Sequence, residues 1–169
     1  MVCGHFREGR TKELNLEGVE RSMFQKVLLL ACGVNGVWVS DMDELLALAA
    51  LADRFGIPDV REAAEREAAR RVTVAECADL LRVATEFGLP LVEAACRGLA
   101  LSQFTAVAAT EGFAELGEED LGQLLEDDGL VAGGEEEVLE AVLRWMGGGP
   151  DGRIRGIPLL DKVHSRDPK

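Results

Sequence analysis

Tyrosine is absent from this sequence of 169 residues, and aromatic residues together make up only 5% of it. Histidine is almost as scarce, because His5 and His164 are the two present and they lie near opposite ends of the chain. Histidine is a frequent general base and a common metal ligand in proteins. Its scarcity argues against an enzyme and against a metal centre.

Basic residues are also few. The chain carries 18 Lys and Arg against 31 Asp and Glu, which gives a formal net charge of −13 at pH 7. This charge would repel a nucleic-acid backbone or an anionic membrane, so we expect protein partners, no nucleic acid and no membrane. No apolar run reaches the roughly 18 residues of a membrane span, and residues 1–10 lack the apolar core of a signal peptide. We expect a cytoplasmic or nuclear protein.

The four cysteines, Cys3, Cys32, Cys77 and Cys96, lie far apart and form no C-x-x-C pair. Free cysteines on apolar helical faces act as small hydrophobic residues, which fits a reducing compartment. Cys3 and His5 have the spacing C-x-H, but no second ligand pair accompanies them.

Two other stretches lack the pattern of a ligand site. The acidic segment 115–128 does not have the alternating D-x-D-x-D-G ligands of a calcium loop, and "GGGP" at 147–150 is followed by no Lys-Ser or Lys-Thr. The sequence therefore predicts a protein that is not an enzyme, with no catalytic, cofactor-binding or metal-binding residues.

A repeat is the clearest internal signal. "RFGIPDV" at 54–60 returns as "EFGLPLV" at 86–92, a displacement of 32 positions. Gly56 and Gly88 suit the left-handed position that ends a helix, and Pro58 and Pro90 suit the first position of the next one. Each copy therefore predicts a helix, a glycine stop and a proline start, which is a helical hairpin.

Helical periodicity runs through most of the chain. Apolar residues recur at helical spacing before both glycine stops, and the pattern continues through "LSQFTAVA", "EEDLGQLLEDD" and "EEEVLEAVLRWM". We predict an all-α fold of tandem helical hairpins, with at most a short strand near Leu14 to Leu16. The periodicity stops after Met146, so 147–169 is predicted to be a linker or loose terminus.

Two expectations concern apolar side chains at the ends of these patterns. Phe55 and Phe87 each close an apolar stripe, so we expect both to be buried, with a cost of about 3–5 kcal/mol for Phe87→Ala. The stripe of Phe24, Val27, Leu28 and Leu30 has no obvious cover within this chain, so we expect it to form an exposed patch.

Five segments, taken in order, carry a resemblance to a known family. They are "ELNLEGVERSMFQKVLLL", "DELLALAALADRFGIPDV", "TVAECADLLRVATEFGLPLVEAA", "SQFTAVAATEGFAELGEEDLGQLLEDDGL" and "EEEVLEAVLRWM". The first two resemble the later part of a BTB (POZ) domain. The other three are similar to the opening of a BACK domain, to its continuation and to its Glu-rich helix ending in Trp. The chain thus resembles a BTB–BACK adaptor of the Kelch-like type over residues 4–146, with a further match at 155–163.

The resemblance implies a partial BTB/POZ domain at 1–70 and a BACK domain at 71–146, or to 163 if the later match is included. In the family, BTB forms dimers and recruits the cullin scaffold of a ubiquitin ligase, while BACK extends that contact and spaces a substrate domain. A short cullin-contact pattern in the family, a hydrophobic residue, any residue and then Glu, matches Phe6, Arg7 and Glu8. The resemblance therefore implies Phe6 and Glu8 as partner-binding residues; the same segment also fits an exposed helix end.

The sequence departs from the family in three ways. The amino-terminal BTB strands that carry the dimer contact would precede the position that Met1 matches, which argues against homodimerisation. Cys32 stands where the family usually has Tyr, and no Kelch or other substrate-reading module follows. The chain thus reads as part of an adaptor. The alternative is a helical scaffold that binds a peptide in a groove between hairpins, unrelated to ubiquitination.

The periodicity predicts a far-ultraviolet circular dichroism spectrum with the two minima of a helical protein, because every periodic stretch after residue 22 repeats at helical spacing. A spectrum dominated by strand would contradict the all-α prediction.

Overall fold

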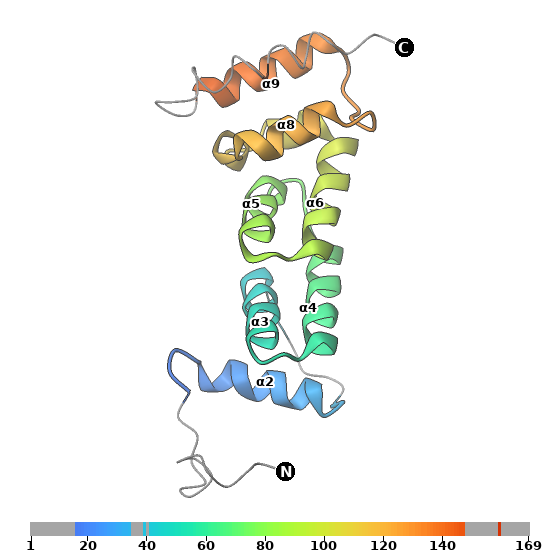
Figure 1. The fold of residues 1–169 in the computed structure, drawn as a ribbon. Coiled ribbons are helices and arrows are strands. Elements are labelled where there is room, and N and C mark those ends of the chain that lie inside the picture. Colours follow the sequence, from blue (N-terminus) through green and yellow to red (C-terminus); the bar gives the residue numbers. More distant parts are fainter. Residues whose placement is uncertain (1–15, 35–38, 40, 148–158, 160–169) are drawn as a thin grey trace, which may run out of the picture.

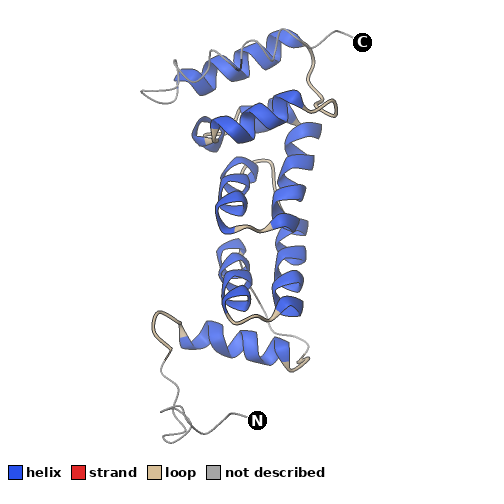
Figure 2. Ribbon diagram, in the orientation of Figure 1, coloured by secondary structure: helices blue, strands red, loops and turns tan. Residues whose placement is uncertain are grey.

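The computed structural model describes residues 16–34, 39, 41–147 and 159. Its helices are α2 (Arg21–Ala31), α3 (Met42–Arg54), α4 (Pro58–Arg71), α5 (Cys77–Phe87), α6 (Pro90–Ser102), α7 (Phe104–Ala108), the 3₁₀ helix η1 (Gly112–Glu115), α8 (Glu118–Glu126) and α9 (Glu135–Gly147). The described residues contain no strand (Figure 2). The all-α prediction is confirmed; of the proposed strand at Leu14 to Leu16 only Leu16 is described, and it is not in a strand.

The helices are stacked into a column (Figure 1). α2 lies at one end, followed by the hairpin of α3 and α4, the hairpin of α5 and α6, and then α8 and α9 at the other end. α3 and α5 lie on one side of the column, with α4 and α6 on the other. Because α4 contacts α6, the second helices of the two hairpins form a continuous side of the molecule.

The two hairpins turn in the same way, as the repeat predicts. Gly56 and Gly88 have φ angles of +64° and +63°, in the left-handed region that favours glycine. The backbone N–H of Ile57 donates to the carbonyl of Ala52 at 2.9 Å. At the equivalent turn, the N–H of Leu89 donates to the carbonyl of Ala84, also at 2.9 Å. Pro58 and Pro90 begin the helices that follow. The prediction of a glycine stop and a proline start is confirmed at both places.

Large buried side chains hold the α9 end of the column together. Phe104 and Phe113 are both 1% exposed and pack edge to face with ring centroids 5.9 Å apart. The indole N–H of Trp145, from α9, donates to the carbonyl of Leu116 at 2.8 Å. Leu159, from the segment beyond α9, is also buried. This cluster ties α7, η1 and α9 into one packed unit.

The expectation that Phe87 is buried is wrong, because its side chain is 60% exposed. Phe55, at the equivalent place in the first hairpin, is half-buried because Phe24 of α2 packs on it, with ring centroids 5.1 Å apart. No aromatic ring of the described residues packs on Phe87 in this way. Each ring stands at the end of its apolar stripe, so its burial depends on a neighbouring helix.

The expectation of an exposed apolar stripe on α2 is also wrong in part. Val27 is fully buried and Phe24 is half-buried, because α2 packs across α3. Lys26 adds an ion pair to Glu44 of α3. Leu28 remains 45% exposed on the outer side of α2. The first hairpin therefore provides the cover that the sequence pattern did not reveal.

We expect Phe104→Ala to lower the free energy of unfolding by about 3–5 kcal/mol, because a fully packed ring leaves a cavity when it is removed. Phe87→Ala is the matched control, with an expected loss below about 1 kcal/mol for an exposed ring. Chemical denaturation of both variants measures the difference. Equal losses would contradict the exposure of Phe87.

Candidate interaction surfaces

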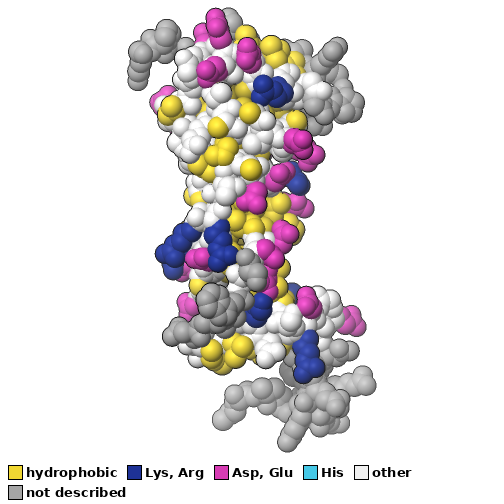
Figure 3. Space-filling model, turned by 180° about the vertical axis from the view of Figure 1, so that it is seen from behind, with side chains coloured by type: hydrophobic (Ala, Val, Ile, Leu, Met, Phe, Trp, Pro, Cys, Tyr) yellow, Lys and Arg dark blue, Asp and Glu magenta, His cyan; other side chains and the backbone are white. Residues whose placement is uncertain are grey.

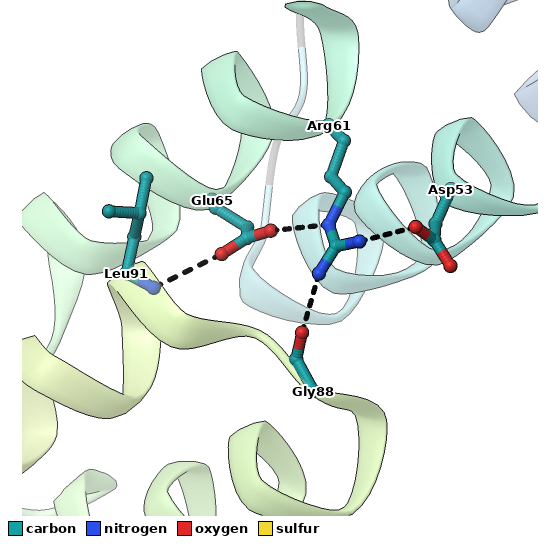
Figure 4. Close-up of polar contacts among 5 residues, drawn as sticks. All are labelled: Asp53, Arg61, Glu65, Gly88 and Leu91. Carbon is teal, nitrogen blue, oxygen red and sulfur yellow. Dashed lines mark hydrogen bonds and ion pairs between the residues drawn. The ribbon is translucent and has the colours of Figure 1, made fainter. Parts of the chain in front are cut away.

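A buried carboxylate joins the two hairpins. The side chain of Glu65, in α4, is 4% exposed, and its Oε1 accepts a hydrogen bond from Nε of Arg61 at 2.7 Å. Its other oxygen, Oε2, accepts from the backbone N–H of Leu91 at 3.1 Å. Figure 4 shows both contacts, which link one turn of α4 to the start of α6. Both oxygens of this carboxylate are therefore hydrogen-bonded.

The contact to Leu91 acts as a cap for α6. The first N–H groups of a helix have no partner within the helix, and the N-cap residue Leu89 has no side chain that can accept from them. Glu65 supplies the missing acceptor from the neighbouring hairpin. It also places a negative charge at the positive end of the helix dipole, which is favourable.

Arg61 completes the junction. Its guanidinium donates to the carboxylate of Asp53, in α3, and to the carbonyl of Gly88 at 2.5 Å (Figure 4). The hydrogen bond with Glu65 is the main reason that the pKa of Arg61 is raised, and the charge of Asp53 adds to it. Arg61 therefore stays charged and links α3, α4 and the turn before α6. We call Asp53, Arg61, Glu65, Gly88 and Leu91 the hairpin junction.

The second hairpin carries the same pair of charges in the opposite order. The positions 32 residues after Arg61 and Glu65 are Glu93 and Arg97. Their side chains also form a hydrogen bond, with Nε of Arg97 3.0 Å from Glu93. Arg97 then donates to Asp120 at 2.8 Å, in the first turn of α8. In the first hairpin, Glu65 thus contacts the start of α6, and in the second hairpin Arg97 contacts the start of α8.

Two cysteines lie buried in the second hairpin. Cys77 and Cys96 are fully buried, and the thiol of Cys77 donates to the backbone carbonyl of Cys96 at 3.3 Å. Hydrogen bonding to Cys77, together with burial, raises the pKa of the Cys96 thiol. The same hydrogen bond lowers the pKa of the Cys77 thiol. The Cys96 thiol stays protonated, which makes it a poor nucleophile and a poor metal ligand. These cysteines fill the core of the second hairpin, as the sequence predicts.

The described residues contain no group of three His, Cys, Asp or Glu side chains that could hold a metal ion. No helix within the described part of the chain is long and apolar enough to cross a membrane. Phe6 and Glu8, the candidate partner-binding residues, lie outside the described residues.

Among the described residues, large exposed apolar side chains occur in three places on the column. Leu28, Leu29 and Val34 lie on α2 and just after it, Phe87 and Leu91 flank the turn between α5 and α6, and Val131 and Leu143 lie near and on α9. Hydrophobic, acidic and basic side chains are interspersed on the rear face (Figure 3). The sequence pattern predicted Phe87 to be buried, because it closes an apolar helical stripe, and it did not single out Leu91.

The second hairpin and the helices after it identify the class of protein. Residues 77–164, more than half of the chain, match the family model described as BTB And C-terminal Kelch, or BACK. The chain belongs to the BACK family. Its resemblance to BTB–BACK proteins of the Kelch-like type is confirmed.

Several curated Kelch-like proteins are similar to the chain. Kelch-like protein 35 of Mus musculus is 35% identical over 111 residues, which cover 66% of this chain and 19% of that protein. Kelch-like protein 38 of Rattus norvegicus is 30% identical over 146 residues, 86% of this chain and 25% of that protein. Kelch-like protein 40 of Xenopus tropicalis is 23% identical over 164 residues, which cover 95% of this chain and 26% of that protein. The chain therefore spans about a fifth to a quarter of the length of these relatives.

We expect Glu65→Ala to lower the free energy of unfolding by about 2–3 kcal/mol, because it removes the acceptor for Leu91 N–H and one partner of Arg61. Glu65→Gln keeps an oxygen acceptor and should recover part of the loss. Glu62→Ala is the control: it removes an exposed pair with Arg66 one turn away, at a cost below about 0.5 kcal/mol. Urea denaturation compares the three. Equal costs for Glu65→Ala and Glu62→Ala would contradict a stabilising junction.

Proposed function

We propose that this chain is a non-enzymatic adaptor part that contacts a cullin scaffold of a ubiquitin ligase and spaces a substrate through its BACK helices. Membership of the BACK family carries this proposal. The strongly negative net charge supports protein partners over nucleic acid or anionic membrane.

The domains in this proposal are the end of a BTB/POZ domain at 1–70 and a BACK domain at 71–146, or to 163. The segment 147–169 is a linker or loose terminus in the shorter version, while the burial of Leu159 favours the longer one. The proposed boundary falls between α4, which ends at Arg71, and α5, which begins at Cys77. The repeat then has a simple origin: one hairpin closes BTB and the next opens BACK.

The hairpin junction gives this arrangement a mechanical role. An adaptor must hold its scaffold contact and its substrate module at a fixed separation and angle. The hairpin junction crosses the proposed boundary with hydrogen bonds from α4 to the turn and first residues of α6. A flexible boundary would let a bound substrate occupy many positions relative to the scaffold. A boundary held by hydrogen bonds therefore suits a spacer.

The cullin contact in this proposal is made by Phe6 and Glu8, with Phe6 in an apolar pocket of the cullin and Glu8 in a charged or hydrogen-bonded contact. We expect Phe6→Ala combined with Glu8→Ala to abolish binding of the chain to the amino-terminal domain of its cullin. Isothermal titration calorimetry against a panel of cullin domains measures the affinity. Circular dichroism should show unchanged helical content.

Lys12→Ala combined with Glu13→Ala is the matched control, because it changes two residues of the same segment outside the three-residue pattern. It should leave the affinity unchanged. Equal affinity of the Phe6 and Glu8 double variant and the unmodified chain would retire the site. Failure of the unmodified chain to bind any cullin domain would retire the cullin contact and favour a helical scaffold for another partner.

A further inference from the structure

We propose that Cys77 and Cys96 are a redox-sensitive pair, which a peroxide oxidises to a disulfide that ties α5 to α6. Nothing in this proposal depends on the cullin contact. Both side chains are 0% exposed, and they lie on the two helices of the second hairpin, which pack against each other. Cys32, in contrast, is exposed and lies outside this hairpin. A disulfide between Cys77 and Cys96 would therefore cross-link one layer of the column.

The two sulfur atoms lie within reach of each other. The thiol of Cys77 donates to the backbone carbonyl of Cys96 at 3.3 Å, so the Cys77 sulfur lies against the residue that carries the second thiol. The two thiols also form a hydrogen bond with each other. Neither helix has to leave its neighbour for the two sulfur atoms to meet. The pair is therefore already arranged for an intramolecular bond.

The surroundings give the two thiols different chemical roles. The hydrogen bond with Cys96 lowers the pKa of the Cys77 thiol, against the effect of burial, and a hydrogen bond from the backbone of Ala100 acts in the same direction. The hydrogen bond with Cys77 raises the pKa of Cys96, and burial and the charge of Glu93 add to this. The thiolate is the nucleophilic form of cysteine. Cys77 therefore reacts first, and Cys96 is the resolving thiol.

The oxidation uses one molecule of hydrogen peroxide. The thiolate of Cys77 attacks one peroxide oxygen, the O–O bond breaks, and Cys77 becomes a sulfenic acid while hydroxide leaves with the proton that Cys77 has lost. The sulfur of Cys96 then attacks the sulfur of Cys77, the S–O bond breaks, and the leaving hydroxide takes the proton of Cys96. The two thiols lose two electrons, and the peroxide is reduced to two molecules of water.

Burial determines which oxidant reaches the pair. Oxidised glutathione must bring its own disulfide into contact with a thiolate, and the packed hairpin leaves both sulfur atoms inaccessible to it. Hydrogen peroxide is little larger than water, so a small opening between α5 and α6 admits it. Disulfides that form in reducing compartments are usually transient and redox-sensing. The pair is therefore expected to respond to peroxide and to resist oxidised glutathione, whereas exposed Cys32 reacts with both.

Peptide mapping of the full chain tests the proposal. The chain is treated with hydrogen peroxide, its remaining thiols are alkylated in denaturant, and its tryptic peptides are analysed by mass spectrometry without a reductant. Trypsin cuts after Arg82, which separates Cys77 in the peptide 72–82 from Cys96 in the peptide 83–97. These two peptides should appear joined and should separate with dithiothreitol. The oxidised chain should melt about 5 °C or more above the reduced chain.

Three variants separate the roles of the cysteines. Cys96→Ala should leave a sulfenic acid at Cys77 that dimedone traps, whereas Cys77→Ala should leave Cys96 as a thiol. In both variants peroxide should no longer raise the melting temperature. Cys32→Ala is the matched control and should keep the joined peptides. Circular dichroism checks that each variant is folded, and the joined peptides of the unmodified chain are measured without any substitution.

Four results would overturn the proposal. The first is the absence of joined peptides at peroxide concentrations that oxidise Cys32, and the second is a disulfide that joins Cys77 to Cys32 in place of Cys96. The third is reaction of the pair with oxidised glutathione as fast as that of Cys32. The fourth is a melting temperature that does not rise on oxidation, because the bond would then not tie the two helices together.

Discussion

One buried carboxylate determines how the two hairpins fit together. Glu65 has both oxygens occupied, one by Arg61 and one by the backbone of Leu91. A carboxylate that is removed from water must have such partners, because an unpaired one costs several kcal/mol. Arg61 and Leu91 lie on different hairpins, so both hydrogen bonds form only when the two hairpins are placed correctly relative to each other. The position of the turn before α6, and with it the exposed pair beside that turn, depends on this constraint.

The repeat preserves a backbone and varies what its side chains do. Gly56 and Gly88 make nearly the same turn. The charged pair Arg61 and Glu65 of α4 becomes Glu93 and Arg97 in α6, with the charges in the opposite order. Glu65 accepts from the backbone N–H of Leu91, whereas Arg97 donates to the carboxylate of Asp120. Because a turn needs only glycine and proline, the surrounding positions are free to differ. One hairpin can therefore receive a helix of its own chain while its copy presents a surface.

The sequence predicts features that depend on near neighbours and misses those that depend on distant ones. The glycine stops and helical stripes are local, so the all-α fold and both turns were predictable. Phe87 was predicted to be buried because a helical pattern cannot tell which stripe has a neighbour at its end. Glu65 and Arg61 look like an ordinary solvated pair at i, i+4 spacing, and nothing in the sequence indicates that Leu91 lies beside them. The pair Glu93 and Arg97, 32 positions later in the sequence, was the signal that could have drawn attention to Arg61 and Glu65.

The order of these contacts along the chain bears on synthesis. Glu65 comes before Leu91, and Arg97 comes before Asp120, so in both pairs the charged side chain leaves the ribosome earlier than its target. Each charge can remain hydrated until the later helix emerges, and it loses its water only when a partner is present. Synthesis in this order therefore allows the layers of the column to pack one after another without burying a lone charge.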